Sequence, residues 1–443
     1  MSEQAPASDP PDVQGPGPDR PWSRATWAPY ASGRALWYSL RGGNVFTITV
    51  LAIFTAFVVG GLLNAFTNTA VLHAWANFFS APGHAIALAW DTAVGAYVAL
   101  FEGSIFNPHT VAALFQQASI SAAIHDGYLS AVFNPLSETC VQATPLILAG
   151  LAVALPYQAG MFNIGAEGQF IGGAIVATYL GYGVSLPVVV HVVVCVIGGF
   201  VGGAAIGWIV GELKARTGAH EVIVTIMLNY IMYNFLSFLL GTPKALQQPG
   251  QSNLISPPVA ASARLPHVGG PPPQVDAGFL IALAAAAGVW WLLSRSTIGF
   301  RFRTVGANPS AARSSGMNVE ESWVLVMLIA GGLAGLAGAA VILGPVQSIT
   351  FNSYGTYGFD GITVALLGRA TPVGVVLAAL LFGALHAGGT TMEAATQVPA
   401  SLVQVLQGLI VLFVAAPPLI RAMFRLRKAR AAGLEAVPKG WNA

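Results

Sequence analysis

The sequence predicts an all-α polytopic membrane protein with about ten transmembrane crossings, each of which needs roughly 20 mostly apolar residues. Between Asn44 and Ile420 the chain is almost wholly apolar. Hydrophobic residues make up 55% of the protein and charged residues only 8%, where an average soluble domain carries roughly 25% charged residues. A surface that faces water needs more polar groups than this, so a lipid bilayer is the expected surrounding.

The basic residues predict the orientation, because loops rich in Lys and Arg stay in the cytoplasm. They gather in four islands: residues 20–41, Lys214 with Arg216, Arg295–Arg313, and the residues from Arg421 onward. We therefore expect both termini and two internal loops to be cytoplasmic. The net charge is only +2, and the basic residues lie beside the predicted spans. Nucleic-acid binding is not expected from this pattern.

These signals divide the chain into three parts. Residues 1–43 are expected to form a disordered, basic cytoplasmic tail, residues 44–420 the membrane domain, and residues 421–443 a cytoplasmic C-terminal tail. Within the membrane domain, residues 67–139 lack Lys and Arg and are predicted to be largely external, as is loop 241–278, whereas loop 295–321 is predicted to be cytoplasmic.

The expected crossings follow the apolar stretches in order. An even number of crossings must separate the N-terminal tail from the Lys214 loop, so the apolar patch His84–Phe101 is not expected to cross. The crossings are predicted at Asn44–Phe66, Ala143–Tyr157, Ile164–Leu180, Leu186–Val210, His220–Leu240, Phe279–Leu293, Val324–Leu343, Phe359–Leu367, Val373–His386 and Leu402–Ile420.

Two glycine-rich segments interrupt the apolar pattern, one in each half of the chain. The first is Gly160–Gln169, and the second is Gly355–Gly361 with the turn that follows Leu367. Irregular backbone at membrane depth persists only where protein or water satisfies its polar groups. Paired interruptions in two halves suggest an internal repeat around a translocation path. The halves share no obvious residue identity, so the repeat rests on the breaks alone.

Three acidic residues lie in or beside predicted spans, where a charge is costly. We expect Glu167 to cap a helix start, and Glu221 either to cap a helix or to pair with Lys214 or Arg216. Asp360 is expected to cap the short helix near Gly361. A proton relay would need several acids aligned through one pore, so capping is the preferred interpretation.

The sequence does not support an enzyme. It contains no metal-binding HExxH pattern, no nucleophile elbow and no phosphate-binding loop of the Gly-x-x-x-x-Gly-Lys-Ser/Thr type. No metal site and no cofactor are expected on this chain. If ATP drives the protein, another chain must bind it.

The predicted cytoplasmic stretch Ser294–Asn318 contains the signals of a turn and one short helix. Asn308 and Pro309 suit a turn and a helix start, and Gly316 is placed to end a helix over Ser310–Ser315. A short helix rich in small residues can dock into a groove on a partner. An ordinary basic loop remains the alternative.

Four motifs in order resemble a known family. They are GMFNIGAEGQ (160–169), LKARTGAHEVIVTIMLNYI (213–231), GFRFRTVGANPSAARSSGM (299–317) and GFDGITVALLGRATPVG (358–374). Together they are similar to permease subunits of nucleoside-type ABC importers for nucleosides and simple sugars. These belong to the superfamily of ribose and branched-chain amino-acid permeases.

The resemblance implies partners and a mechanism. The chain would be one of two homologous permeases in a heterodimeric pore of the bacterial cytoplasmic membrane. ABC ATPase domains would bind ATP on a partner chain, and an extracytoplasmic substrate-binding lipoprotein would deliver the solute. ATP-driven alternating access would then move nucleosides inward. Ribose-like sugars or branched-chain amino acids are the alternative substrates, and a stand-alone secondary transporter is a less favoured reading.

The resemblance also assigns residues to two roles. The cytoplasmic segment Gly306–Gly316 matches the helix that couples such permeases to their ATPases. The coupling residues would be Arg301, Arg303, Gly306, Asn308, Pro309, Ala311, Ala312, Arg313 and Gly316. The broken-helix residues near the pathway would be Asn163, Gly165, Glu167, Gly168, Gln169, Phe359, Asp360 and Gly361.

Overall fold

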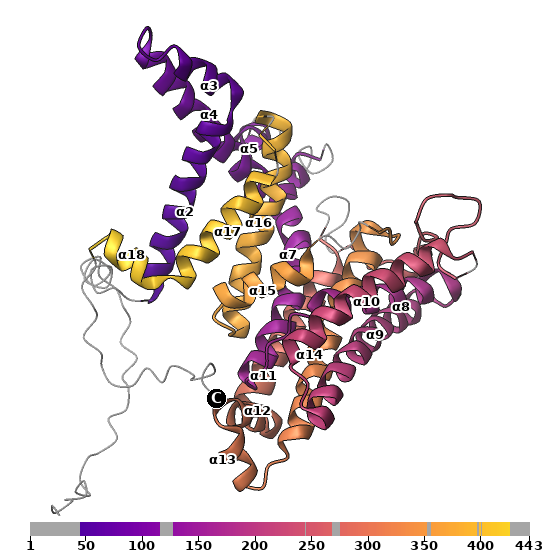
Figure 1. The fold of residues 1–443 in the computed structure, drawn as a ribbon. Helices are drawn as coiled ribbons and strands as arrows, with labels where there is room; N and C mark the ends of the chain where they lie inside the picture. Colours follow the sequence, from indigo (N-terminus) through magenta and orange to yellow (C-terminus); the bar gives the residue numbers. More distant parts are fainter. Residues whose placement is uncertain are drawn as a thin grey trace, which may run out of the picture.

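The computed structural model describes residues 45–115, 127–243, 245–267, 275–351, 356–396, 398–399 and 401–425. The predicted tails over 1–43 and most of 421–443 lie outside these ranges. Helices dominate the described residues, which contain no named strand (Figure 1). The helices are α2 (Val45–Thr67), α3 (Thr69–Ala76), α4 (Pro82–Ser104), α5 (Pro108–Phe115), α7 (Tyr128–Gln158), α8 (Ala166–Gly183), α9 (Val188–Thr217), α10 (Glu221–Gly241), α11 (Ala277–Arg295), α12 (Thr297–Ala307), α13 (Pro309–Ser314), α14 (Val319–Val341), α15 (Tyr357–Leu367), α16 (Pro372–Thr396), α17 (Ser401–Ala415) and α18 (Pro417–Met423), with the short turns η1 (Ala261–Ala263) and η2 (Ile342–Val346).

The fold is that of an all-α polytopic membrane protein. Within the described residues, eight helices are long and apolar enough to cross a membrane: α2, α4, α7, α9, α10, α11, α14 and α16. The number becomes nine if α17 and α18, which are bent by 88°, form one span. The predicted number of about ten crossings is therefore not confirmed.

The difference from ten has a physical cause at the helix breaks. α15 has 11 residues, about 16 Å of helix, roughly half of the hydrocarbon thickness. α8 has 18 residues and begins at a break inside the protein. Conversely, α4 is a continuous helix of 23 residues that meets the length and composition requirements. The even-number argument predicted that residues 84–101 do not cross the membrane. The length and composition of α4 nevertheless permit a crossing.

The two halves of the membrane domain pack against each other reciprocally. In the first half, α7 is followed by a break and then by α8 and α9. In the second half, α14 is followed by a break and then by α15 and α16. α14 packs against α8 and α9, whereas α7 packs against α15 and α16. Each leading helix thus contacts the helices that follow the break in the other half, the arrangement expected of an internal repeat.

The loop over residues 295–321, which was predicted to be cytoplasmic, lies at one end of the bundle (Figure 1). Figure 1 shows α12 and α13 at this end, and the connection between α10 and α11 at the opposite end. That connection contacts the residues after α14 through a β-bridge between Ile255 and Thr350. The predicted cytoplasmic loop 295–321 and the predicted external loop 241–278 therefore lie at opposite ends of the structure.

The most extensive helix pair is α9 with α14, and it is built on glycine. Gly199, Gly203 and Gly207 of α9 face Gly331 and Gly335 of α14. A methyl group on any of these five would come closer to the other helix than van der Waals contact permits. Small residues at four-residue spacing let two helix backbones approach in this way within a membrane. The glycines of α9 therefore serve the close packing of this helix against α14.

Gly203→Val should destabilise the protein strongly. The new side chain would overlap the carbonyl oxygen of Gly331. Because the neighbouring atoms belong to the backbone, no change of side-chain rotamer can relieve this overlap. We expect a loss of about 2–3 kcal/mol, the upper range for overpacking, seen as a lower thermal midpoint in detergent. Gly288→Val on α11 is the matched control, because nothing lies within 4 Å of a Cβ there. Equal midpoints for the two variants would contradict the packing role.

Candidate functional site

The first helix break lies between α7 and α8 and is organised by Asn163. This side chain is fully buried. Its amide donates to the carbonyl oxygen of Ala152 at 3.1 Å and to Oε1 of Gln169 at 2.8 Å. Its Oδ1 accepts from the backbone N–H of Gly165 at 3.0 Å. Asn163, held in place by Gln169, thus satisfies backbone groups that the break removes from the helix hydrogen bonding, as backbone in a membrane requires.

Asn229 of α10 completes this support from a neighbouring helix. Its Oδ1 accepts from the backbone N–H of Gly168 at 2.8 Å, and its Nδ2 donates to the carbonyl oxygen of Ile164 at 3.0 Å. A Cβ on Gly168 would lie only 2.9 Å from that Oδ1, so the close approach depends on glycine. Asn229 belongs to the Leu228–Ile231 motif, but the motif alone did not predict this contact.

Glu167 joins the first break to the second. Its Oε2 accepts from the backbone N–H of Gly358 at 2.8 Å, in the first turn of α15. A side chain on Gly358 would overlap the backbone of Glu167. Glu167 is fully buried and lies in the first turn of α8. Glu167 was predicted to cap a helix start. The helix that it caps is α15, where the positive end of the helix dipole favours a negative group.

The start of α15 carries the other predicted pathway residues. Asp360 accepts a hydrogen bond from the Thr356 hydroxyl at 2.9 Å, and its Oδ2 lies 3.9 Å from Nε2 of His386 on α16. Gly361 packs against α7, where a Cβ would lie 2.8 Å from the backbone of Ala149. Phe359 is 42% exposed. The structure therefore brings the two predicted segments together, with Phe359 directed away from the buried contact.

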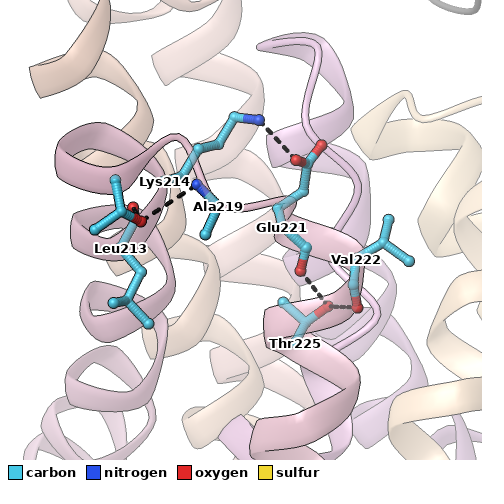
Figure 2. Close-up of polar contacts among 7 residues, drawn as sticks. Leu213, Lys214, Ala219, Glu221, Val222 and Thr225 are labelled. Carbon is cyan, nitrogen blue, oxygen red and sulfur yellow. Dashed lines mark hydrogen bonds and ion pairs between the residues drawn. The ribbon is translucent and has the colours of Figure 1, made fainter.

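A third group of polar residues ties α9 to α10. Figure 2 shows Lys214 reaching Glu221, with a distance of 2.6 Å between Nζ and Oε2. The Thr225 hydroxyl donates to the carbonyl oxygen of Glu221 at 2.8 Å (Figure 2). Lys214 also lies 5.0 Å from the ring centre of Trp323 on α14. The predicted pairing of Glu221 with Lys214 is confirmed.

The loop between α11 and α14 contains the predicted short helix, α13, and also α12, which was not predicted; together they form a helical hairpin. Asn308 caps α13, since its side chain accepts from the backbone N–H of Ala311 at 3.0 Å. Pro309 is the first residue of α13, and Gly316 follows its end with φ of +80°. Ala312 is buried, whereas Ala311 is exposed. The exposed side of α13 therefore carries small residues, and the buried Ala312 packs this helix against the rest of the protein.

Two of the three predicted coupling arginines pair within the chain. Arg301 Nη2 lies 2.9 Å from Oε2 of Glu321, and Arg313 pairs with Glu320. Both glutamates lie in the first turn of α14. Arg303 is exposed on α12. The hairpin is thus braced against the start of α14, a contact that the basic composition alone did not predict.

Gly306 joins the hairpin to the first break. A Cβ on Gly306 would overlap the carbonyl oxygen of Gln158, and it would lie 2.9 Å from the nitrogen of Gly160. The Gln158 side chain in turn donates to the carbonyl oxygen of Ala370, beyond α15, at 2.8 Å. α12, the end of α7 and the end of α15 therefore meet at one point.

A cavity of about 110 Å³ lies beside the second break, between η2 and the start of α15. It is bounded by α7, by η2 at the end of α14, by the first residue of α15 and by the residue before α11. Its polar lining residues are Gln142, Thr144, Asp276 and Tyr357. Sequence reasoning missed Gln142, Thr144 and Asp276, whereas Tyr357 lies in the predicted segment Gly355–Gly361. The one available signal was Asp276, an acidic residue at the end of the Pro-rich loop 241–278 and directly before an apolar helix.

The chain matches one protein family over most of its membrane domain. Residues 136–415 match the permease component of the branched-chain amino acid transport system. This chain belongs to that permease family. It is therefore a multi-pass transport subunit, and its function is transport and not catalysis. No solved structure matches the permease.

Curated relatives of the permease cover most of its length. It is 37% identical over 347 residues to the guanosine ABC transporter permease protein NupP of Bacillus subtilis, covering 77% of this chain and 95% of the relative. It is 33% identical to the nucleoside ABC transporter permease protein NupB of Lactococcus lactis, covering 72% and 90%. It is 38% identical over 288 residues to the glucose ABC transporter permease protein TsgB13 of Haloferax volcanii, covering 63% and 75%.

Asn229→Ala should destabilise the first break. It leaves the Gly168 N–H and the Ile164 carbonyl buried without their partner, at about 1–3 kcal/mol for each group. We expect a lower thermal midpoint in detergent and reduced solute uptake. Asn234→Ala on the same helix is the control, because Asn234 is exposed and bonds only the carbonyl oxygen of Tyr230 in its own helix. A midpoint like that of the control would contradict the support role of Asn229.

Proposed function

We propose that this permease is one of two homologous membrane subunits of an ABC importer for nucleosides. The observation that carries the proposal is the match to NupP, which extends over 95% of that guanosine permease. NupB, named for nucleosides, is covered over 90% of its length. The substrate class is inferred from these relatives.

The second permease subunit is inferred from paired relatives. The permease is also 26% identical to NupQ of Bacillus subtilis, a guanosine permease protein from the species of NupP. It is 24% identical to NupC of Lactococcus lactis, a nucleoside permease protein from the species of NupB. Two species thus each carry two permeases related to this chain. We infer a heterodimeric pore, with an ATPase and an extracytoplasmic binding lipoprotein as further partners.

The cytoplasmic hairpin supports coupling to a separate ATPase. α13 presents Ser310, Ala311 and Ser314, which are exposed and small enough for close contact with a groove. A push on α13 would pass to α14 through the arginine–glutamate pairs. The same push would reach α7 and α15 through Gly306 and Gln158. In this mechanism ATP-driven closure of the partner reorients both halves around the paired breaks.

A sugar importer is the second candidate, because TsgB13 is named for glucose and is 38% identical. The family description names branched-chain amino acids, a third substrate class. The three classes differ in ways that competition separates, since a nucleoside carries a base, a sugar carries hydroxyl groups alone, and an amino acid is charged.

Deletion of the gene should abolish uptake of labelled uridine, and excess guanosine should compete with that uptake in cells that keep the gene. Excess glucose and leucine should leave it unchanged. Complementation with the intact gene is the control. Competition by glucose would move the substrate to the sugars, and uridine uptake that is indifferent to the deletion would contradict the nucleoside proposal.

Ala311→Trp should prevent assembly with the ATPase. The indole would project from the exposed face of α13 without entering the protein's own core, so the thermal midpoint should stay unchanged. Co-purification of the ATPase should fall by about tenfold or more, because a loss of about 1.4 kcal/mol already has that effect. Ala287→Trp, at an exposed position of α11, is the control. An ATPase that still assembles and drives transport would rule out α13 as its docking element.

A further inference from the structure

The cavity between α7 and η2 is placed where a solute would enter the permease from outside. Asp276 ends the connection between α10 and α11, which lies at the opposite end of the bundle from α12 and α13 (Figure 1). Pro345 and Val341 line the cavity from the end of α14. There Gly344 departs from helical geometry, with φ −97° and ψ −107°. Breaks of this kind in membrane helices accompany solute sites in transporters.

The cavity wall contains a buried carboxylate whose two oxygens have different surroundings. Asp276 is only 4% exposed. Its Oδ1 caps α11 by accepting from the backbone N–H of Gly278 at 2.9 Å. Its Oδ2 points toward Gly344, where a Cβ would overlap it. Capping therefore explains one oxygen of this side chain, and the glycine in the break leaves room around the other.

A chain of hydrogen-bonding side chains continues from the cavity along α7. The Tyr357 hydroxyl donates to Oε1 of Gln142 at 3.3 Å, and the Gln142 amide donates to Oε1 of Glu138 at 3.1 Å. The Tyr357 ring stacks on Phe170, with ring centres 5.9 Å apart. The ring is thus held in place while its hydroxyl faces polar partners.

The charge of this wall selects a class of ligand. The lining includes Asp276 and no Lys or Arg, and Glu138 ends the chain along α7. An anionic ligand would be repelled by these carboxylates, whereas a neutral molecule with several hydroxyl donors would be favoured. A cavity of about 150 Å³ holds one benzene ring, so this cavity of about 110 Å³ takes part of a small ring and leaves the rest of the molecule in its open mouth.

We propose that this cavity is an entry site for the sugar ring of the solute, in which Asp276 accepts hydrogen bonds from neighbouring ring hydroxyls and Gln142 and Tyr357 contact the same ring. The inference rests on the proposed importer function and extends it to a named site. The ligand chemistry is a sugar ring with neighbouring hydroxyls. A nucleoside and a free sugar both supply it, which accords with relatives named for nucleosides and for glucose.

Asp276→Asn separates ligand binding from helix capping. Asn caps a helix start as well as Asp does, so α11 should remain intact while the charge is lost. Tyr357→Phe, as a second variant, keeps the ring stacked on Phe170 and removes only the hydroxyl. Asp91→Asn, at an exposed position of α4 outside the cavity, is the matched control.

The test uses the complete transporter with its binding protein in proteoliposomes. We would measure ATP-dependent uptake of uridine against 2′,3′-dideoxyuridine, and of glucose against 2-deoxyglucose. Because all variants use the same binding protein, a change in either ratio arises in the permease. Asp276→Asn should lower the preference for the hydroxylated member about tenfold, the effect of one charge-assisted hydrogen bond, and Tyr357→Phe should lower it less.

The outcomes separate the two proposals. If wild-type complex takes up uridine and Asp276→Asn leaves the ratio unchanged, or lowers both members of the pair equally, the entry site is wrong and the nucleoside proposal stands. If the wild-type complex takes up glucose and not uridine, the nucleoside proposal is wrong, and the glucose pair decides the entry site. If neither solute is taken up, both proposals are overturned.

Discussion

The fold depends on one constraint, that backbone interrupted inside a membrane must find hydrogen-bond partners within the protein. The two breaks meet this constraint partly through each other. Glu167 from the first break holds the backbone N–H of Gly358 in the second, and Asn163 and Asn229 satisfy groups around the first. The first half thus supplies a hydrogen-bond acceptor to the break in the second half. α7 and α14 each pack on helices of the opposite half.

The same breaks are connected to the α12–α13 hairpin by close contacts. Gly306 on α12 abuts Gln158 at the end of α7, and Gln158 bonds Ala370 beyond α15. The first turn of α14 is bound by arginines from the hairpin. Under the proposed mechanism, a displacement of α13 would reach the leading helices of both halves through these contacts. Chains of packed and hydrogen-bonded groups of this kind can carry coupling between distant sites.

The sequence predicted the fold class, the short helix after Asn308 and the position of both breaks, because these depend on hydropathy, charge and local turn chemistry. Asn308, Pro309 and Gly316 have the predicted geometry. The contact between Glu167 and Gly358 spans 191 residues and has no local signature. The crossing number failed for a related reason: a helix that begins at a break, such as α15, is as apolar as a full span but shorter. Likewise Gln142, Asp276 and Tyr357 come from distant segments, and only the tertiary fold places them on one cavity.

The glycine contact between α9 and α14 has a consequence for how the subunit can move. Side chains at an ordinary helix interface can change rotamer and let two helices slide. Here backbone meets backbone at Gly203 and Gly331, so there is no side chain that can adjust and little freedom to slide. We therefore expect α9 and α14 to travel as one rigid body, with the deformation of each transport cycle concentrated where α7 meets α15 and α16.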